Sequence, residues 1–189
     1  MTQPGTPSMP IPGPVLEMVR WLQATTLFRG MADQEALLLL RQCGRMKVET
    51  FEVICAENEP GDALFYILDG QVYLTRLIGE EEEFLGMLGK GNSFGEAGLL
   101  GEEARTATVR ARQPSLLLTL QPTLLHLLPN ELALKLMRNI AMTGGEKLKM
   151  ANRIIDRLYE ELRSLRPKTQ DWREDEDRFI EKFEGNSPI

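Results

Sequence analysis

The sequence predicts an α+β protein: an antiparallel β-roll of the jelly-roll type, flanked by N-terminal helices and a long C-terminal helix. Between residues 46 and 128, short runs rich in Val, Ile, Leu, Phe and Tyr alternate with turn residues such as Glu59-Pro60-Gly61-Asp62 and Asp69-Gly70. On both sides of this segment, apolar residues instead recur every three or four positions, which is the period of an amphipathic helix. The change of period marks the limits of the roll.

The length and the net charge of the chain favour a single globular domain and argue against some functions. The chain has 189 residues and a formal net charge of -6, and one domain of that size can bury its own core without a metal or a disulfide. Cys43 and Cys55 lie in apolar-flanked stretches, so we expect buried, reduced thiols and a cytoplasmic protein. The acidic excess argues against sequence-independent nucleic-acid binding, in which Lys and Arg neutralise phosphates.

The N-terminal part contains an arm and two helices. Residues 1–14 hold five prolines, no basic segment and no long apolar run, so we expect a disordered arm rather than a signal peptide or an anchor. Residues 15–45 carry two short amphipathic helices, the second with an acidic first turn at Asp33.

Within the roll, Asp69-Gly70 lies between two apolar runs, 63–68 and 71–77, and predicts that these runs pair as a β-hairpin. The longest apolar run, 116–128, is interrupted by polar residues and is too short to span a bilayer. We therefore expect no membrane insertion.

The C-terminal part, residues 129–166, is predicted to be helical. Leucine, alanine and isoleucine residues there step by three and four positions, as in a coiled coil, at Leu148, Ala151, Ile155, Leu158, Leu162 and Leu165. This stripe either packs onto the chain's own roll or pairs with a second copy, and we favour a homodimer through residues 148–165. Gly144-Gly145 marks a hinge or a junction of two helices. Residues 167–189 form an acidic tail that either folds back or docks on a protein partner.

One stretch carries the chemistry of a ligand site. The segment 94–100, FGEAGLL, predicts a glycine turn followed by one helical turn, whose backbone N–H groups suit an anion. Arg105 follows nine residues after Glu96 and can grip a phosphate with two parallel charge-assisted hydrogen bonds. Glu96 can accept a hydrogen bond from a sugar hydroxyl. These residues predict a pocket for a small phosphorylated sugar, although an Arg105–Glu96 ion pair in an empty pocket would account for them too.

These motifs resemble the cyclic nucleotide-binding domain shared by the catabolite activator protein, the regulatory subunit of protein kinase A and cyclic nucleotide-gated channels. The family's phosphate-binding cassette is similar to FGE-A-x-L-L followed by R-[STA]-A-x-V-x-A, and the segment 57–74, ENEPGDALFYILDGQVYL, looks like its first hairpins. One departure is Glu57-Asn58-Glu59, where the family often has Glu-Gly-Asp; it affects a turn. The resemblance implies a ligand site that comprises Phe94, Gly95, Glu96, Ala97, Leu99, Arg105, Thr106 and Ala107.

The resemblance also implies the roles of these residues. Arg105 would bind the cyclic phosphate and Glu96 the ribose 2′-OH, while Gly95, Ala97 and Ala107 would lend backbone N–H groups. Thr106 would touch the phosphate or the base. The ligand is cAMP or cGMP: a Thr at this place suits guanine, yet cAMP binders of the family also carry Ser or Thr there.

Other functions are disfavoured. The chain has a single histidine, His126, in an apolar stretch where we expect a partly buried structural role, so no metal site and no enzyme is expected. Related transcription factors continue after the long helix with a DNA-binding module, whereas here only 23 residues follow Arg166, and their charge is acidic rather than basic. We expect a stand-alone, non-enzymatic cyclic nucleotide sensor without a DNA-binding domain, which acts through its C-terminal helix on an unidentified protein partner. The alternative is a constitutive dimeric adaptor with a degenerate or unused pocket.

Overall fold

The computed structural model describes residues 11–100 and 104–165. The chain divides into two compact units between Glu146 and Lys147. The helices are α1 (Gly13–Gln23), α2 (Asp33–Gln42), α3 (Ala97–Leu100), α4 (Leu124–Leu127) and α5 (Asn130–Leu165). The strands are β1 (Gly44–Val48), β2 (Val53–Cys55), β3 (Leu64–Asp69), β4 (Gln71–Ile78), β5 (Glu81–Gly89), β6 (Ser93–Phe94), β7 (Thr108–Ala111) and β8 (Ser115–Leu120).

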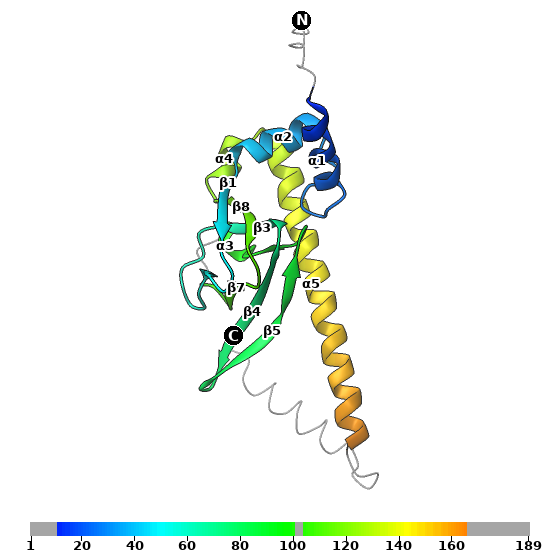
Figure 1. Cartoon of the computed structure of the whole chain (residues 1–189). Coiled ribbons are helices and arrows are strands. Elements are labelled where there is room, and N and C mark those ends of the chain that lie inside the picture. Colours follow the sequence, from blue (N-terminus) through cyan, green and yellow to red (C-terminus); the bar gives the residue numbers. More distant parts are fainter. Residues whose placement is uncertain (1–10, 101–103, 166–189) are drawn as a thin grey trace, which may run out of the picture. The chain divides into compact units, whose positions relative to one another are not determined.

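The strands of the first unit form two four-stranded sheets, β1-β8-β3-β6 and β2-β7-β4-β5. Every pair of neighbouring strands is antiparallel, and Figure 1 shows the two sheets forming a β-roll with α1 and α2 at one end. The predicted fold class is thus confirmed. One boundary differs, because α1 begins at Gly13, inside the segment expected to be an arm, with Pro14 in its first turn, where the missing N–H costs nothing.

The hairpin predicted at Asp69-Gly70 is wrong. Strand β3 pairs with β8 and β6, and β4 pairs with β5 and β7, so the chain crosses from one sheet to the other at Gly70. This glycine has φ +95°, and a Cβ there would lie 2.1 Å from the Ser115 hydroxyl oxygen. The turn residues Asp69-Gly70 determine where the chain reverses direction. Which strands then pair depends on how the apolar side chains of β3 and β4 are buried. The hairpin forms instead between β4 and β5, around Gly79.

Strand β3 is apolar on both faces because both faces of its sheet are covered. Leu64 and Tyr66 belong to a core cluster that includes α1, α2 and the first turns of α5. Phe65 and Ile67, which alternate with them, belong to a second cluster between the two sheets. A continuous apolar run is what a strand buried on both faces requires. Cys43 and Cys55 are both buried free thiols, as expected.

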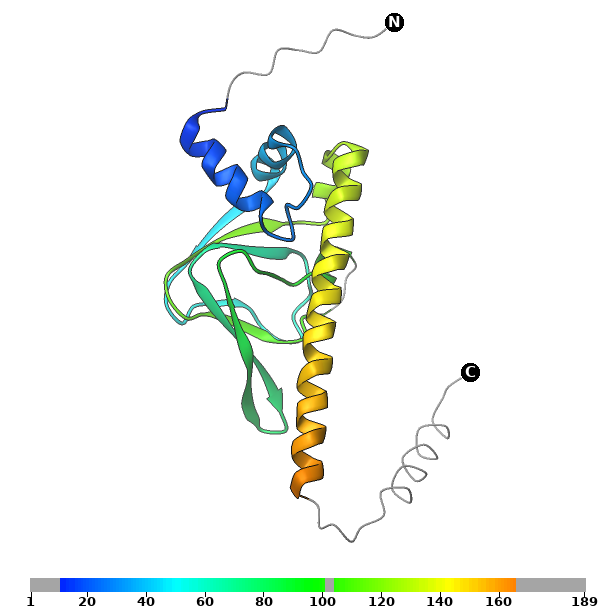
Figure 2. The ribbon, with the colours of Figure 1, turned by 90° about the vertical axis from the view of Figure 1, so that its right-hand side faces the viewer.

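The first turns of α5 lie beside the N-terminal helices (Figure 2), and polar contacts of residues 130–146 fix them there. The fully buried Asn139 donates from Nδ2 to the carbonyl oxygens of Leu27 (3.0 Å) and Arg29 (2.9 Å). Lys135 pairs with Glu35 at 2.7 Å, and this hydrogen bond lowers the pKa of Glu35. The start of α5 is therefore held in one register against the turn after α1.

The second unit begins at Lys147, two residues after the glycine pair. Helix α5 is continuous through Gly144 and Gly145, and a Cβ at either glycine would meet no atom within 4 Å. Beyond them, the predicted stripe is exposed: Leu148 by 63%, Ile155 by 48% and Leu158 by 52%. The side chains of Leu162 and Leu165, the arm to residue 10 and the tail from residue 167 lie outside the description. His126 is exposed rather than partly buried, since it lies on the open side of the short helix α4.

None of the helices in residues 11–100 and 104–165 has the length and apolar character needed to cross a membrane.

Replacing Asn139 with Ala should lower the free energy of unfolding by about 2 kcal/mol, because the change removes one buried and one partly buried hydrogen bond to carbonyl oxygens. Urea denaturation followed by circular dichroism measures this loss. The matched control is Asn152→Ala, an exposed position of the same helix, where we expect about 0.5 kcal/mol or less, because Ala favours the helix. Equal losses for both variants would contradict the role given to Asn139.

Candidate functional site

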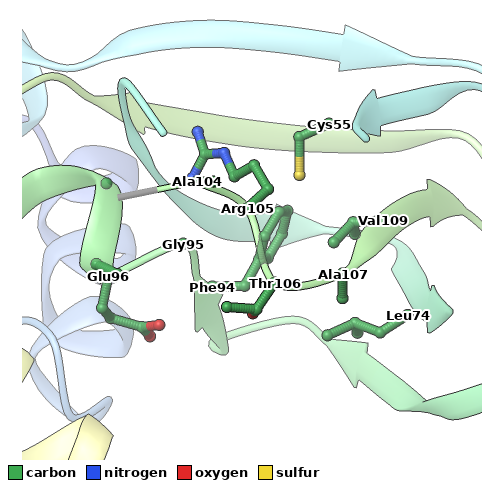
Figure 3. A pocket seen from close by; sticks show the side chains of 12 residues that line it. Cys55, Leu74, Phe94, Gly95, Glu96, Ala104, Arg105, Thr106, Ala107 and Val109 are labelled. Atoms are coloured by element: carbon green, nitrogen blue, oxygen red, sulfur yellow. The ribbon is translucent and has the colours of Figure 1, made fainter. Parts of the chain in front are cut away.

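A cavity of about 130 Å³ lies in the roll, next to the segment that joins β6 to α3 (Figure 3). Its walls are Cys55, Leu74, Phe94, Gly95, Glu96, Ala97, Gly98, Ala104, Arg105, Thr106, Ala107 and Val109. Seven of the eight site residues expected from the sequence line it. The exception is Leu99, which is 2% exposed and packs in the helix-side core. The structure thus brings the two parts of the motif to one cavity.

The backbone of Arg105 is held by the loop that precedes β3. Its N–H donates to the carbonyl oxygen of Glu59 at 2.8 Å, and its own carbonyl oxygen accepts from the Asn58 N–H at 2.9 Å. Pro60 and Ala104 form an isolated bridge beside these bonds. The turn 57–59 therefore positions the arginine through main-chain groups, which do not depend on the identity of its side chains.

The side chain of Arg105 is buried, with 5% exposed. Nη1 donates to the carbonyl oxygen of Ala63 at 2.8 Å, and Nη2 pairs with Oδ1 of Asp62 at 3.2 Å. The guanidinium carbon lies 5.2 Å from the centre of the Phe65 ring, within cation–π range. Nε is buried and has no hydrogen-bond partner in the described residues. A buried N–H without an acceptor is costly, so this arginine can still take an anionic acceptor.

Two glycines make room for the guanidinium. A Cβ at Gly95 would lie 2.5 Å from Nη1 of Arg105 and 3.0 Å from the carbonyl oxygen of Ala63, and the residue has φ +76°. A Cβ at Gly98 would lie 2.9 Å from the carbonyl carbon of Gly61 and 3.0 Å from Nη1. Both positions therefore require glycine for the arginine to be buried here.

Glu96 does not pair with Arg105. Its Oε1 accepts from the Ser93 hydroxyl at 3.0 Å, and in Figure 3 its carboxylate points away from the guanidinium. The Arg105–Glu96 ion pair considered from the sequence is not formed, because Asp62 takes the place of the carboxylate partner. Thr106 is exposed at the cavity wall, and its carbonyl oxygen accepts from Nε of Arg76 at 2.9 Å.

The sequence did not indicate five of the wall residues, which are Cys55, Leu74, Gly98, Ala104 and Val109. Leu74 and Val109 are opposite each other in the β4–β7 pair and face inward, so their alternation along the strands could have revealed them. Cys55 was expected to be an ordinary core residue. Burial raises the pKa of its thiol, although the nearby charge of Arg105 acts in the opposite direction.

Within 11–100 and 104–165, no group of three or more His, Cys, Asp or Glu side chains could hold a metal ion. What the site combines is a buried guanidinium, small residues and backbone groups around one cavity. The fold and this cavity define a β-roll domain with a cavity whose chemistry suits a small anionic molecule.

Comparison with known proteins shows which family this segment resembles. Residues 45–128, slightly less than half of the chain, match the family model of the cyclic nucleotide-binding domain.

Two curated relatives each align over 100 residues, 52% of this chain. The cGMP-dependent protein kinase egl-4 of Caenorhabditis elegans is 32% identical, and the cyclic AMP receptor protein of Thermus thermophilus is 34% identical. The crystal structure of the Thermus thermophilus catabolite activator protein superposes with a TM-score of 0.65 at 31% identity, over 71% of this chain. The aligned parts span 13% of the kinase, 46% of the receptor and 63% of the crystallised chain.

Replacing Gly95 with Ala should destabilise the domain more than replacing Gly79 with Ala. Both glycines have positive φ, +76° and +67°, but a Cβ at Gly79 would meet open space. We expect about 1 kcal/mol for Gly79→Ala from the backbone alone, and a further ~2 kcal/mol for Gly95→Ala from the clash with Arg105. Thermal unfolding of both variants measures the difference, and similar melting temperatures would show that the guanidinium moves aside freely.

Proposed function

We propose that this protein is a non-enzymatic sensor of cyclic nucleotide, cAMP or cGMP. The observation that carries the proposal is Arg105, a buried cation with an unpartnered Nε that lines a cavity together with two glycines and three alanines. A cyclic phosphate supplies the acceptor that this guanidinium lacks, and the small wall residues allow the phosphate to approach the main chain.

Each of the eight site residues expected from the sequence has a role in this proposal. Arg105 binds the phosphate oxygens and Glu96 accepts from the ribose 2′-OH. Gly95, Ala97 and Ala107 offer backbone N–H groups, while Thr106, exposed at the wall, contacts phosphate or base. Phe94 acts indirectly, because its ring stacks on Phe65 at 5.1 Å, and Phe65 in turn supports the guanidinium. Leu99 anchors the α3 turn in the core rather than touching the ligand.

The base is left open between adenine and guanine. The names of the two relatives point to different nucleotides, because one is a cGMP-dependent protein kinase and the other is a cyclic AMP receptor protein. The Thr106 hydroxyl can serve either base. A titration with both nucleotides therefore belongs to the test of function.

The signal is proposed to leave the domain through α5. Residues 130–146 are fixed to the N-terminal part of the chain, and this segment ends with the glycine pair and Glu146, after which the chain divides into its two units. A ligand shifts such an equilibrium only by its differential affinity for two states. We propose that nucleotide binding changes how residues 147–165 are presented to a protein partner in the cytoplasm, without DNA binding, a metal cofactor or catalysis.

Isothermal titration calorimetry tests the binding. We expect a micromolar or tighter dissociation constant for cAMP or cGMP, and a loss of about 30-fold or more in Arg105→Ala, because truncating one partner of a buried charge pair costs at least about 2 kcal/mol.

Arg112→Ala is the matched control, because Arg112 is exposed and lines neither that cavity nor any other described here. It should bind as the unchanged protein does. No heat with either nucleotide, at protein concentrations of tens of micromolar, would exclude the sensor.

A second candidate function rests on a different observation, the exposed apolar stripe of the second unit. Leu148, Ile155 and Leu158 are each about half or more exposed, and a helix with such a stripe is normally covered. A homodimer through residues 148–165 would cover it. If the pocket is unused, the protein is a constitutive dimeric adaptor.

Sedimentation equilibrium tests the dimer. We expect a dimer at tens of micromolar and a monomer for Leu158→Asp, because a buried unpaired carboxylate is costly. Arg153→Asp, which lies off the stripe, should remain dimeric. A monomeric unchanged protein would refute the pairing of this stripe, and a dimer that forms equally with and without nucleotide favours the adaptor.

A further inference from the structure

A second, larger cavity shares two wall residues with the first, Cys55 and Arg105. Its volume is about 570 Å³, within the range of roughly 300–1,000 Å³ that is typical of small-molecule sites. Its apolar walls come from Met46, Ile54 and Phe65 on three strands. Its polar groups are Glu59, Asp62, Thr119, Gln121 and the arginine itself.

The guanidinium of Arg105 is bonded to the wall of this second cavity. Both acceptors of its terminal amino groups, the Ala63 carbonyl oxygen and the Asp62 carboxylate, line the larger cavity and not the smaller one. The two partners differ in environment, because 5% of the Arg105 side chain and 80% of the Asp62 side chain are exposed. The carboxylate therefore faces the solvent-accessible side of the cavity.

The charges of the cavity favour a cation as ligand. Asp62 and Glu59 bring two carboxylates, both on exposed residues, against one guanidinium. Thr119 and Gln121 add oxygen atoms that accept hydrogen bonds. The partly exposed side chain of Ile54 offers an apolar surface, to which Phe65, 5% exposed, adds a small area. An anion would meet the two carboxylates first.

We propose that this cavity binds an organic ammonium ion with an apolar body of about the size of one aromatic ring. The ammonium group donates to the carboxylate of Asp62, and the apolar body packs against Ile54 and Phe65. The site is distinct from the nucleotide cavity, and its occupancy does not require that nucleotide bind.

The two cavities are coupled through Arg105, a step that rests on the proposed function. A cyclic phosphate that draws the guanidinium toward the smaller cavity leaves the Asp62 carboxylate without its partner. An ammonium ion then replaces the guanidinium beside Asp62. Each ligand therefore strengthens the binding of the other, and by thermodynamic linkage the factor is the same in both directions.

Nuclear magnetic resonance titration tests the site with two probes of equal shape, 2-phenylethylammonium and the neutral 2-phenylethanol. We expect the resonances of Ile54, Thr119 and Gln121 to shift, and the ammonium ion to bind about fivefold or more tightly than the alcohol. Asp62→Asn should abolish this preference. Asp69→Asn, the same change at an exposed aspartate outside both cavities, should preserve it. Equal affinity of the two probes, or shifts confined to other surfaces, overturns the site.

The coupling is tested by repeating the ammonium titration with saturating cAMP or cGMP. We expect about fivefold tighter binding of the ammonium ion, the lower end of usual couplings between sites, and no change in Asp62→Asn. An unchanged or weaker affinity in the nucleotide-bound protein overturns the coupling. If neither nucleotide binds, the coupling fails together with the proposed function, whereas the ammonium site is still decided by the first titration.

Discussion

The burial of one positive charge, that of Arg105, organises the centre of this domain. A guanidinium can leave water only if hydrogen bonds and opposite charge compensate for the lost hydration. Here the compensation comes from one short segment, since Glu59 accepts from the Arg105 backbone, and Asp62 and Ala63 accept from its side chain. The loop before β3 is thus shaped by the residue that it holds.

The buried charge of Arg105 also explains why two glycines lie on the other side of the guanidinium from the loop before β3. A Cβ at Gly95 or Gly98 would lie only 2.5 Å or 3.0 Å from Nη1, so any side chain there would compete with the guanidinium for space. Phe65 and Phe94 stack beneath it and keep the ring face available to the cation. Cavity, glycine turn and aromatic pair are therefore one unit built around the arginine, rather than three independent features.

The sequence predicted those features of the fold and the site that depend on residues close together in the chain. Alternating apolar residues revealed the strands, and the spacing of Gly95, Glu96 and Arg105 revealed the cavity wall. It failed where the partner is distant: the strand facing β3 is β8, about fifty residues further on, and Asp69-Gly70 changes sheet instead of forming a hairpin. The Asp62–Arg105 pair spans 43 residues and the Asn139–Leu27 bond spans 112. No local pattern specifies which carboxylate or carbonyl such a group will meet.

The unequal exposure of Asp62 and Arg105 bears on how a sensor of this kind would switch. An ion pair with one largely hydrated partner contributes little to stability, because water replaces the lost contact when the carboxylate is released. The guanidinium, in contrast, cannot return to water without leaving the core. A phosphate that offers several acceptors can therefore displace Asp62 at small cost, and it also satisfies Nε, which Asp62 and Ala63 leave unbonded. The hydrogen bond that a phosphate makes to Nε would then contribute free energy to a change of state. The strength of the Asp62–Arg105 ion pair would set how much of that free energy is spent on displacing Asp62.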